Sequence, residues 1–253
     1  MKKISQEELN DLIRESGPLH LSGIDLRGLD LSKAKFLWSD LNEANLSGLD
    51  LSGLDLGQAE FTEADLSGAN LKKAILSGSS FVRANLSGTD LRGTELIMTD
   101  LRGANLSKAN LNMLDLSNAY LGGAYLREAD LKHTILTKAD LSYSDLCFAD
   151  LSDATLRDAD LSGAILRGTY LSGANLNGAD LSDSDLNFVN SVYISNPRNF
   201  DLSNTNLSGA NLNKADLSLA NLSGADLSGA EYTKGTKWPY KFDPIAAGAI
   251  LTP

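Results

Sequence analysis

The chain has 253 residues, with 22 Lys and Arg against 33 Asp and Glu, so its net charge is −11. Nucleic acid and anionic membranes repel such a chain, and we therefore expect neither as a direct partner. The single cysteine excludes an intramolecular disulfide, and no apolar run reaches the ~18 residues of a membrane span. The start, MKKISQEELNDL, lacks the apolar run of a signal peptide, so we expect a cytoplasmic protein.

Residues 1–18 are predicted to form a short helix that caps the chain's first coil. Ser5 and Glu8 have the spacing of a capping box, and Leu9 begins an apolar face. Gly17-Pro18 is a typical helix stop.

Residues 19–186 repeat with a period of five. Between Leu21 and Leu186 there are 34 positions spaced by five, of which 31 are Leu and three are Phe. The residue two before each is Ala, Ser or Thr in 28 cases, and the residue one before is Asp or Asn in 22. Steps of five would spiral around a helix, by about 140° each, and would alternate between the faces of a flat strand. The chain must therefore bend once in every pentapeptide to return each leucine to one interior.

Bends near 90° would close a square after four pentapeptides, so that twenty residues make one coil. Successive coils would then stack at strand spacing, about 4.8 Å. Leucine and the small residue two before it would point inward, and Asp, Asn, Ser and Gly would occupy the bends, where these residue types favour turns.

The A(D/N)LxG pattern, as in "LSGANLNGADLSDSDL", resembles the pentapeptide-repeat family over about residues 19–234. The resemblance implies an all-β solenoid, a right-handed quadrilateral β-helix; its handedness comes from the resemblance alone. The period of five fits neither hexapeptide β-helices nor leucine-rich repeats.

The repeat is interrupted once, at residues 187–201, and resumes in a register shifted by one over 202–234. The interruption is either a β-bulge or a recognition loop. Counting three pentapeptides within it predicts about 11 coils. We read it as three pentapeptides plus one residue.

Residues 235–253 are predicted to be a C-terminal capping tail. Trp238, Phe242, Ile250 and Leu251 could close the last coil. The "TKWP…FDP…AAGA" run resembles the tails of cyanobacterial pentapeptide-repeat proteins, with Tyr240-Lys241 in place of the Glu-Gly common there. With both ends capped, we expect a monomer.

No arrangement of residues predicts catalysis or a cofactor. His20 and His133, the two histidines, lie many coils apart, and Cys147 is expected to point outward without a histidine nearby. The repeated Asp is first a turn former, so we expect no enzyme, no cofactor and no selective metal site.

The late part of the first register is the candidate surface for a protein partner. Residues 140–185 hold nine acids against two arginines. Aromatic and acidic side chains at outward positions form a candidate docking patch, although the aromatics could also merely shield backbone at the corners. The candidate residues are Tyr125, Asp140, Tyr143, Asp145, Phe148, Asp160, Ile165, Asp180 and Phe188.

Two functions follow. The first is a non-enzymatic interaction protein that binds an unidentified protein partner through this surface. The second is a DNA-mimicking binder of DNA gyrase or another topoisomerase, which the resemblance implies because some family members of this shape act on gyrase.

Overall fold

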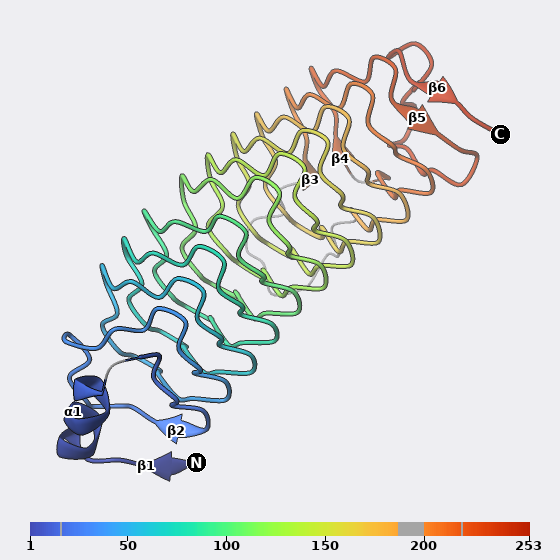
Figure 1. Cartoon of the computed structure of the whole chain (residues 1–253). Coiled ribbons are helices and arrows are strands. Elements are labelled where there is room, and N and C mark those ends of the chain that lie inside the picture. Colours follow the sequence, from blue (N-terminus) through green and yellow to red (C-terminus); the bar gives the residue numbers. More distant parts are fainter. Residues whose placement is uncertain (16, 187–199, 219) are drawn as a thin grey trace, which may run out of the picture.

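The computed structural model describes residues 1–15, 17–186, 200–218 and 220–253. The chain winds into a rod with its two termini at opposite ends (Figure 1). Short strands pair in parallel, as β1 with β2, β3 with β4 and β5 with β6. The elements are β1 (Lys2–Lys3), α1 (Gln6–Arg14), β2 (Ile24–Asp25), β3 (Phe200–Asp201), β4 (Ala220–Asn221), β5 (Glu231–Tyr232) and β6 (Ile250–Leu251).

Isolated parallel bridges join most outward positions before the interruption to the one twenty residues later, as between His20 and Asp40. The predicted twenty-residue coil of four pentapeptides is therefore confirmed. The bridges form four columns, which define the faces of the rod. Face A holds residues 20, 40 and every twentieth to 180, then 211 and 231; face B holds 25 to 185, 216 and 237; face C holds 50 to 170; and face D holds 55 to 175, 206 and 226.

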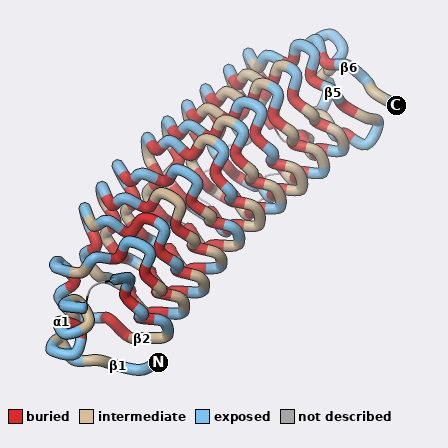
Figure 2. The backbone as a smooth tube through the Cα atoms, in the orientation of Figure 1, coloured by how far each residue is buried: buried red, intermediate tan, exposed pale blue. Residues whose placement is uncertain are grey.

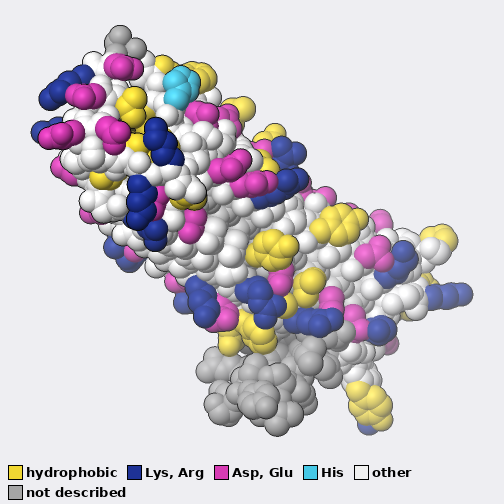
Figure 3. Space-filling model, turned by 90° about the horizontal axis from the view of Figure 1, so that it is seen from below, with side chains coloured by type: hydrophobic (Ala, Val, Ile, Leu, Met, Phe, Trp, Pro, Cys, Tyr) yellow, Lys and Arg dark blue, Asp and Glu magenta, His cyan; other side chains and the backbone are white. Residues whose placement is uncertain are grey.

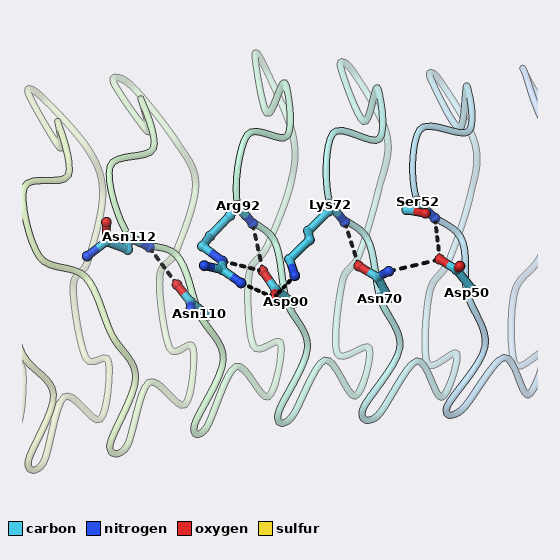
Figure 4. Close-up of polar contacts among 8 residues, drawn as sticks. All are labelled: Asp50, Ser52, Asn70, Lys72, Asp90, Arg92, Asn110 and Asn112. Carbon is cyan, nitrogen blue, oxygen red and sulfur yellow. Dashed lines mark hydrogen bonds and ion pairs between the residues drawn. The ribbon is translucent and has the colours of Figure 1, made fainter.

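The corners between faces are tight turns, and an outward Asp or Asn side chain stabilises many of them. On face C, one side-chain oxygen of Asp50 accepts the backbone N–H of Ser52, and Asn70 and Asn110 do the same two residues ahead (Figure 4). The fourth turn residue donates its N–H to the leucine carbonyl, and the third residue has positive φ, as in a type II turn. These interactions explain why Asp and Asn dominate the position before the leucine.

The interior is a continuous column of leucines, most of them with a small residue beside them. Figure 2 shows buried positions recurring along every coil of the rod. Phe61 and Phe81 take leucine positions and stack, with ring centroids 4.6 Å apart. At most of the positions where the small residue is Thr or Ser, its buried hydroxyl donates to a leucine carbonyl, as Thr134 does to Leu131 at 2.6 Å, whereas the Ser39 hydroxyl accepts the backbone N–H of Leu19. The narrow interior thus accepts these hydroxyls without leaving them unpaired.

The coil that contains the interruption carries more extra residues than the sequence count predicts. Asn175 is bridged to Asn206, 31 residues later in place of 20, so this coil carries eleven extra residues. Reading residues 187–201 as three pentapeptides plus one was therefore wrong, because Asn206, and not a residue 20 or 21 positions later, follows Asn175 in the face D column. The last step along face A, from Glu231 to Ile250, comes from the C-terminal tail. Whether the interruption is a bulge or a loop lies outside the described residues, which exclude 187–199.

The N-terminal end is covered by α1, whose capping box joins Ser5 and Glu8 as expected. Leu9 is fully buried and belongs to the same core as the leucine column. At the other end, Trp238 packs edge-on against Tyr232 and stacks on Phe242. Ile250 and Leu251 were expected to close the last coil, but both are about half exposed, because β6 uses its backbone to pair with β5.

Candidate protein-binding surface

Two columns of predicted residues are stacked as the sequence indicates. Asp140, Asp160 and Asp180 are bridged on consecutive coils of face A. On face B, Tyr125, Asp145 and Ile165 are likewise bridged on consecutive coils. Tyr143 lies at the corner between these two faces.

Many carboxylates of the rod are neutralised by a neighbouring cation. Asp90 accepts two hydrogen bonds from the Arg92 guanidinium and pairs with Lys72 at 3.0 Å (Figure 4). The Arg92 guanidinium holds the pKa of Asp90 well below its usual range, and Arg102 lowers the pKa of Asp100 in the same way. Such carboxylates contribute to the rod's own stability.

The three face A carboxylates differ from these. Asp140, Asp160 and Asp180 each accept the backbone N–H two residues ahead, and Asp140 also accepts the hydroxyl of Ser142. In the part of the chain that the structure describes, none of the three has an ion-pair partner within 4.0 Å. Their charges are fixed in place by turns and remain available to an external cation.

Asp145 does not belong with these carboxylates, although the sequence placed it among them. Its side chain is 19% exposed and lies 3.1 Å from Arg127. Burial opposes its ionisation, but hydrogen bonds from Cys147 and Arg127 lower its pKa. Cys147 itself was expected to point outward and is instead buried, and burial, together with Asp145, raises the pKa of its thiol to about 11.

Four exposed apolar side chains adjoin the face A carboxylates. Tyr120 precedes Asp140 on face A, Tyr125 and Ile165 lie on face B, and Tyr143 projects from the corner with 76% of its surface exposed. We call Tyr120, Tyr125, Tyr143 and Ile165 the tyrosine patch. Tyr120 was not among the predicted site residues, but its place twenty residues before Asp140 is the signal that could have found it.

The Tyr143 ring is held against the next coil. A Cβ added to Gly163, twenty residues later, would lie 2.7 Å from two ring carbons of Tyr143. One side of the ring therefore covers a glycine, which no larger residue could replace without moving it. The Tyr143 ring is therefore held in one position at the corner.

Phe148 belongs to a separate feature. It lies at the corner between faces B and C and lines a shallow depression of about 560 Å³. In that depression Lys132 lies 3.1 Å from Asp150 and 3.7 Å from Asp130. Hydrophobic and charged side chains of both signs gather over the middle of the rod in Figure 3. Phe188, the last predicted residue, lies outside the described residues.

Comparison with known proteins identifies the repeat. The model of pentapeptide repeats matches eight copies over residues 20–48, 39–78, 79–113, 115–147, 149–187 and 201–231. The chain belongs to the pentapeptide-repeat family. Membership implies a right-handed quadrilateral β-helix, which agrees with the twenty-residue coils.

Solved structures include several similar pentapeptide-repeat proteins. HetL, involved in heterocyst differentiation regulation in the cyanobacterium Nostoc sp. strain PCC 7120, is 32% identical over 91% of this chain and 92% of that one, with a TM-score of 0.44. A second Nostoc protein, alr5209, is 34% identical over 55% of this chain and 84% of that one, with a TM-score of 0.28. QnrB1, a plasmid-mediated fluoroquinolone resistance protein, is 21% identical in its trypsin-treated M102R form, over 87% and 90%, with a TM-score of 0.37. No curated protein matches.

The described residues of this pentapeptide-repeat protein contain no cluster of three or more His, Cys, Asp or Glu that could hold a metal ion. His133 lies at a corner, 3.9 Å from Asp153, and His20 lies near the N-terminal end. Within the same residues, no helix is long and apolar enough to cross a membrane.

Proposed function

We propose that this pentapeptide-repeat protein is a non-enzymatic interaction protein that binds a basic protein partner. The observation that carries the proposal is the set of three carboxylates on consecutive coils of face A, which have no ion pair among the described residues and lie beside the tyrosine patch. Tyrosine is enriched among residues that dominate binding energy at interfaces, and a carboxylate ladder complements lysine and arginine. We propose that the protein acts as a monomer.

The charge of the surface supports a protein partner over a nucleic acid. Asp140, Asp160 and Asp180 would repel phosphates, and they would attract a surface that carries lysine or arginine. A regulatory role through protein binding would also suit the relation to HetL, which is involved in regulating heterocyst differentiation.

Capture from a lysate of the source organism tests the proposal. The site variant D140N/D160N/D180N removes three charges and keeps the turns, because Asn already accepts the same backbone hydrogen bond at Asn70 and Asn110. The matched control, D55N/D115N/D226N, removes three charges from face D, where each carboxylate also holds a turn and has no ion pair among the described residues.

The proposal expects one protein to be captured by the wild type and the control and to be lost from the site variant. Tyr143→Ala should also release it, whereas Phe148→Ala, in the separate depression, should not. High salt should weaken capture, since screening acts on exposed charges. Equal capture by both triple variants would refute the proposal.

The alternative is a DNA-mimicking binder of DNA gyrase or another topoisomerase. The observation that favours it is the even spacing of the three carboxylates along the rod, which presents a regular row of negative charge. A supercoiling assay titrated with the protein tests it directly. Inhibition by the wild type and the face D control, and none by the face A variant, would favour this alternative.

A further inference from the structure

We infer that the partner presents a basic amphipathic α-helix, which lies along the rod axis over the corner between faces A and B. The inference rests on the proposed function and specifies the partner's chemistry. It starts from the tyrosine patch, an exposed apolar surface, and from the carboxylates that lie beside it.

The spacing of the carboxylates favours a helix over an extended segment. Asp140, Asp160 and Asp180 lie on successive coils. Along the rod axis, Asp160 and Asp180 therefore lie about 4.8 Å and 9.6 Å from Asp140. Residues i, i+3 and i+7 of a helix lie about 4.5 Å and 10.5 Å along its axis, within about 1 Å of the carboxylates. Same-side residues of an extended strand lie about 6.8 Å and 13.6 Å along, and so miss by about 2 Å and 4 Å.

The apolar side chains adjoin the carboxylates on one side. Tyr143 lies at the corner, and Tyr125 and Ile165 lie beyond it on face B. A helix with basic residues at i, i+3 and i+7 carries a neighbouring stripe at i+1, i+4 and i+8, which faces this corner when the basic stripe faces face A. The expected helix therefore has Lys or Arg on the first stripe and apolar residues on the second.

The position of the Tyr143 ring favours this contact. Its ring already lies over Gly163, so binding restricts it less than it would a freely rotating side chain. The outer side of the ring can accept an aliphatic side chain or a guanidinium, which is attracted to an aromatic face. The face C depression is a poorer site for the same helix, because Lys132 occupies its carboxylates.

Three fluorescent peptides of identical composition test the inference. The striped peptide, of about 18 residues, is rich in alanine and carries arginine at i, i+3 and i+7 and leucine at i+1, i+4 and i+8. A scrambled peptide destroys the stripes, and a third keeps helical periodicity but exchanges its leucine positions with alanines on the opposite face. Binding is measured by fluorescence anisotropy at low and moderate salt, and peptide helicity by circular dichroism.

The striped peptide should bind wild type and D55N/D115N/D226N alike and should bind D140N/D160N/D180N about tenfold more weakly. Tyr143→Ala should cost a similar factor, and the two altered peptides should bind about tenfold more weakly than the striped one. Equal binding of all three peptides, lost in the face A variant, would overturn the helix and leave a charge-driven interaction protein. No binding of the striped peptide to wild type would also overturn the helix, and lysate capture would then decide the proposed function separately.

Discussion

Replacing Gly163 by alanine tests how the Tyr143 ring is positioned. Gly163 and Gly123 occupy the same corner, with φ of 65° and 67°. A Cβ at Gly123 meets nothing within 4 Å, whereas one at Gly163 would lie 2.7 Å from the Tyr143 ring. The two substitutions thus share the same backbone cost and differ only in the ring.

The magnitude follows from the exposure of Tyr143. An alanine at positive φ costs roughly 1–2 kcal/mol, and the lost flexibility of the unfolded chain returns about 0.4–1 kcal/mol, so Gly123→Ala should destabilise by about 1 kcal/mol. Tyr143 is 76% exposed, so the folded rod covers about a quarter of its roughly 200 Å². Displacing the ring exposes about 50 Å², which adds about 1 kcal/mol for Gly163→Ala.

Guanidinium chloride unfolding, followed by circular dichroism, measures both free energies of unfolding. In a Tyr143→Ala background, Gly163→Ala should cost no more than Gly123→Ala, because the ring is gone. The reasoning fails if Gly163→Ala remains the costlier substitution in that background. If the proposed function is correct, Gly163→Ala should also weaken partner capture, whereas Gly123→Ala should not.

Three further predictions concern other parts of the rod. Arg92 depresses the pKa of Asp90, so this pair stabilises the fold above the unfolded pKa of about 3.9, and the stabilisation is lost as the pH falls below that value. Arg92→Gln should therefore reduce the destabilisation by acid, by less than about 1 kcal/mol, whereas Arg157→Gln, which removes a side chain with no ion pair among the described residues, should not. Equal acid unfolding curves for Arg92→Gln and wild type would contradict this prediction. Cys147, with its pKa raised to about 11, should react with iodoacetamide at pH 8 at least about 100-fold more slowly in the folded protein than in urea, and similar rates would show that the thiol is accessible. Trp238→Ala should destabilise the protein by about 2 kcal/mol in thermal unfolding, whereas Trp238→Phe should be nearly neutral, because the buried indole N–H has no hydrogen-bond partner among the described residues. Equal losses for the two variants would assign the effect to that N–H.

The sequence was sufficient for the repeating architecture because each position in the pentapeptide has one physical task. Leucine fills the interior, a small residue shares its side, and Asp or Asn holds the corner turn, so the twenty-residue coil could be predicted before any contact was known. The eleven extra residues in the coil that follows Asn175 could not be predicted. An insertion of one residue and an insertion of eleven, which is one residue plus two pentapeptides, shift the register of the repeat by the same amount.

The site was predicted only in part for a related reason. Stacking every twenty residues follows from the coil, and it placed Asp140, Asp160 and Asp180 together. Pairing across coils depends on which way long side chains turn. The repeat does not specify this, so the commitment of Asp145 to Arg127 and the burial of Cys147 became visible only in three dimensions.

The third residue of each corner turn has a consequence for how such a protein can change. Its positive φ is met by glycine at many corners, yet Trp38, Met98 and Tyr143 adopt the same conformation with exposed side chains. A substitution there alters neither the leucine column nor the hydrogen bonds between coils. Selection can therefore revise what the rod displays, one corner at a time, while the residues that make it fold stay constant.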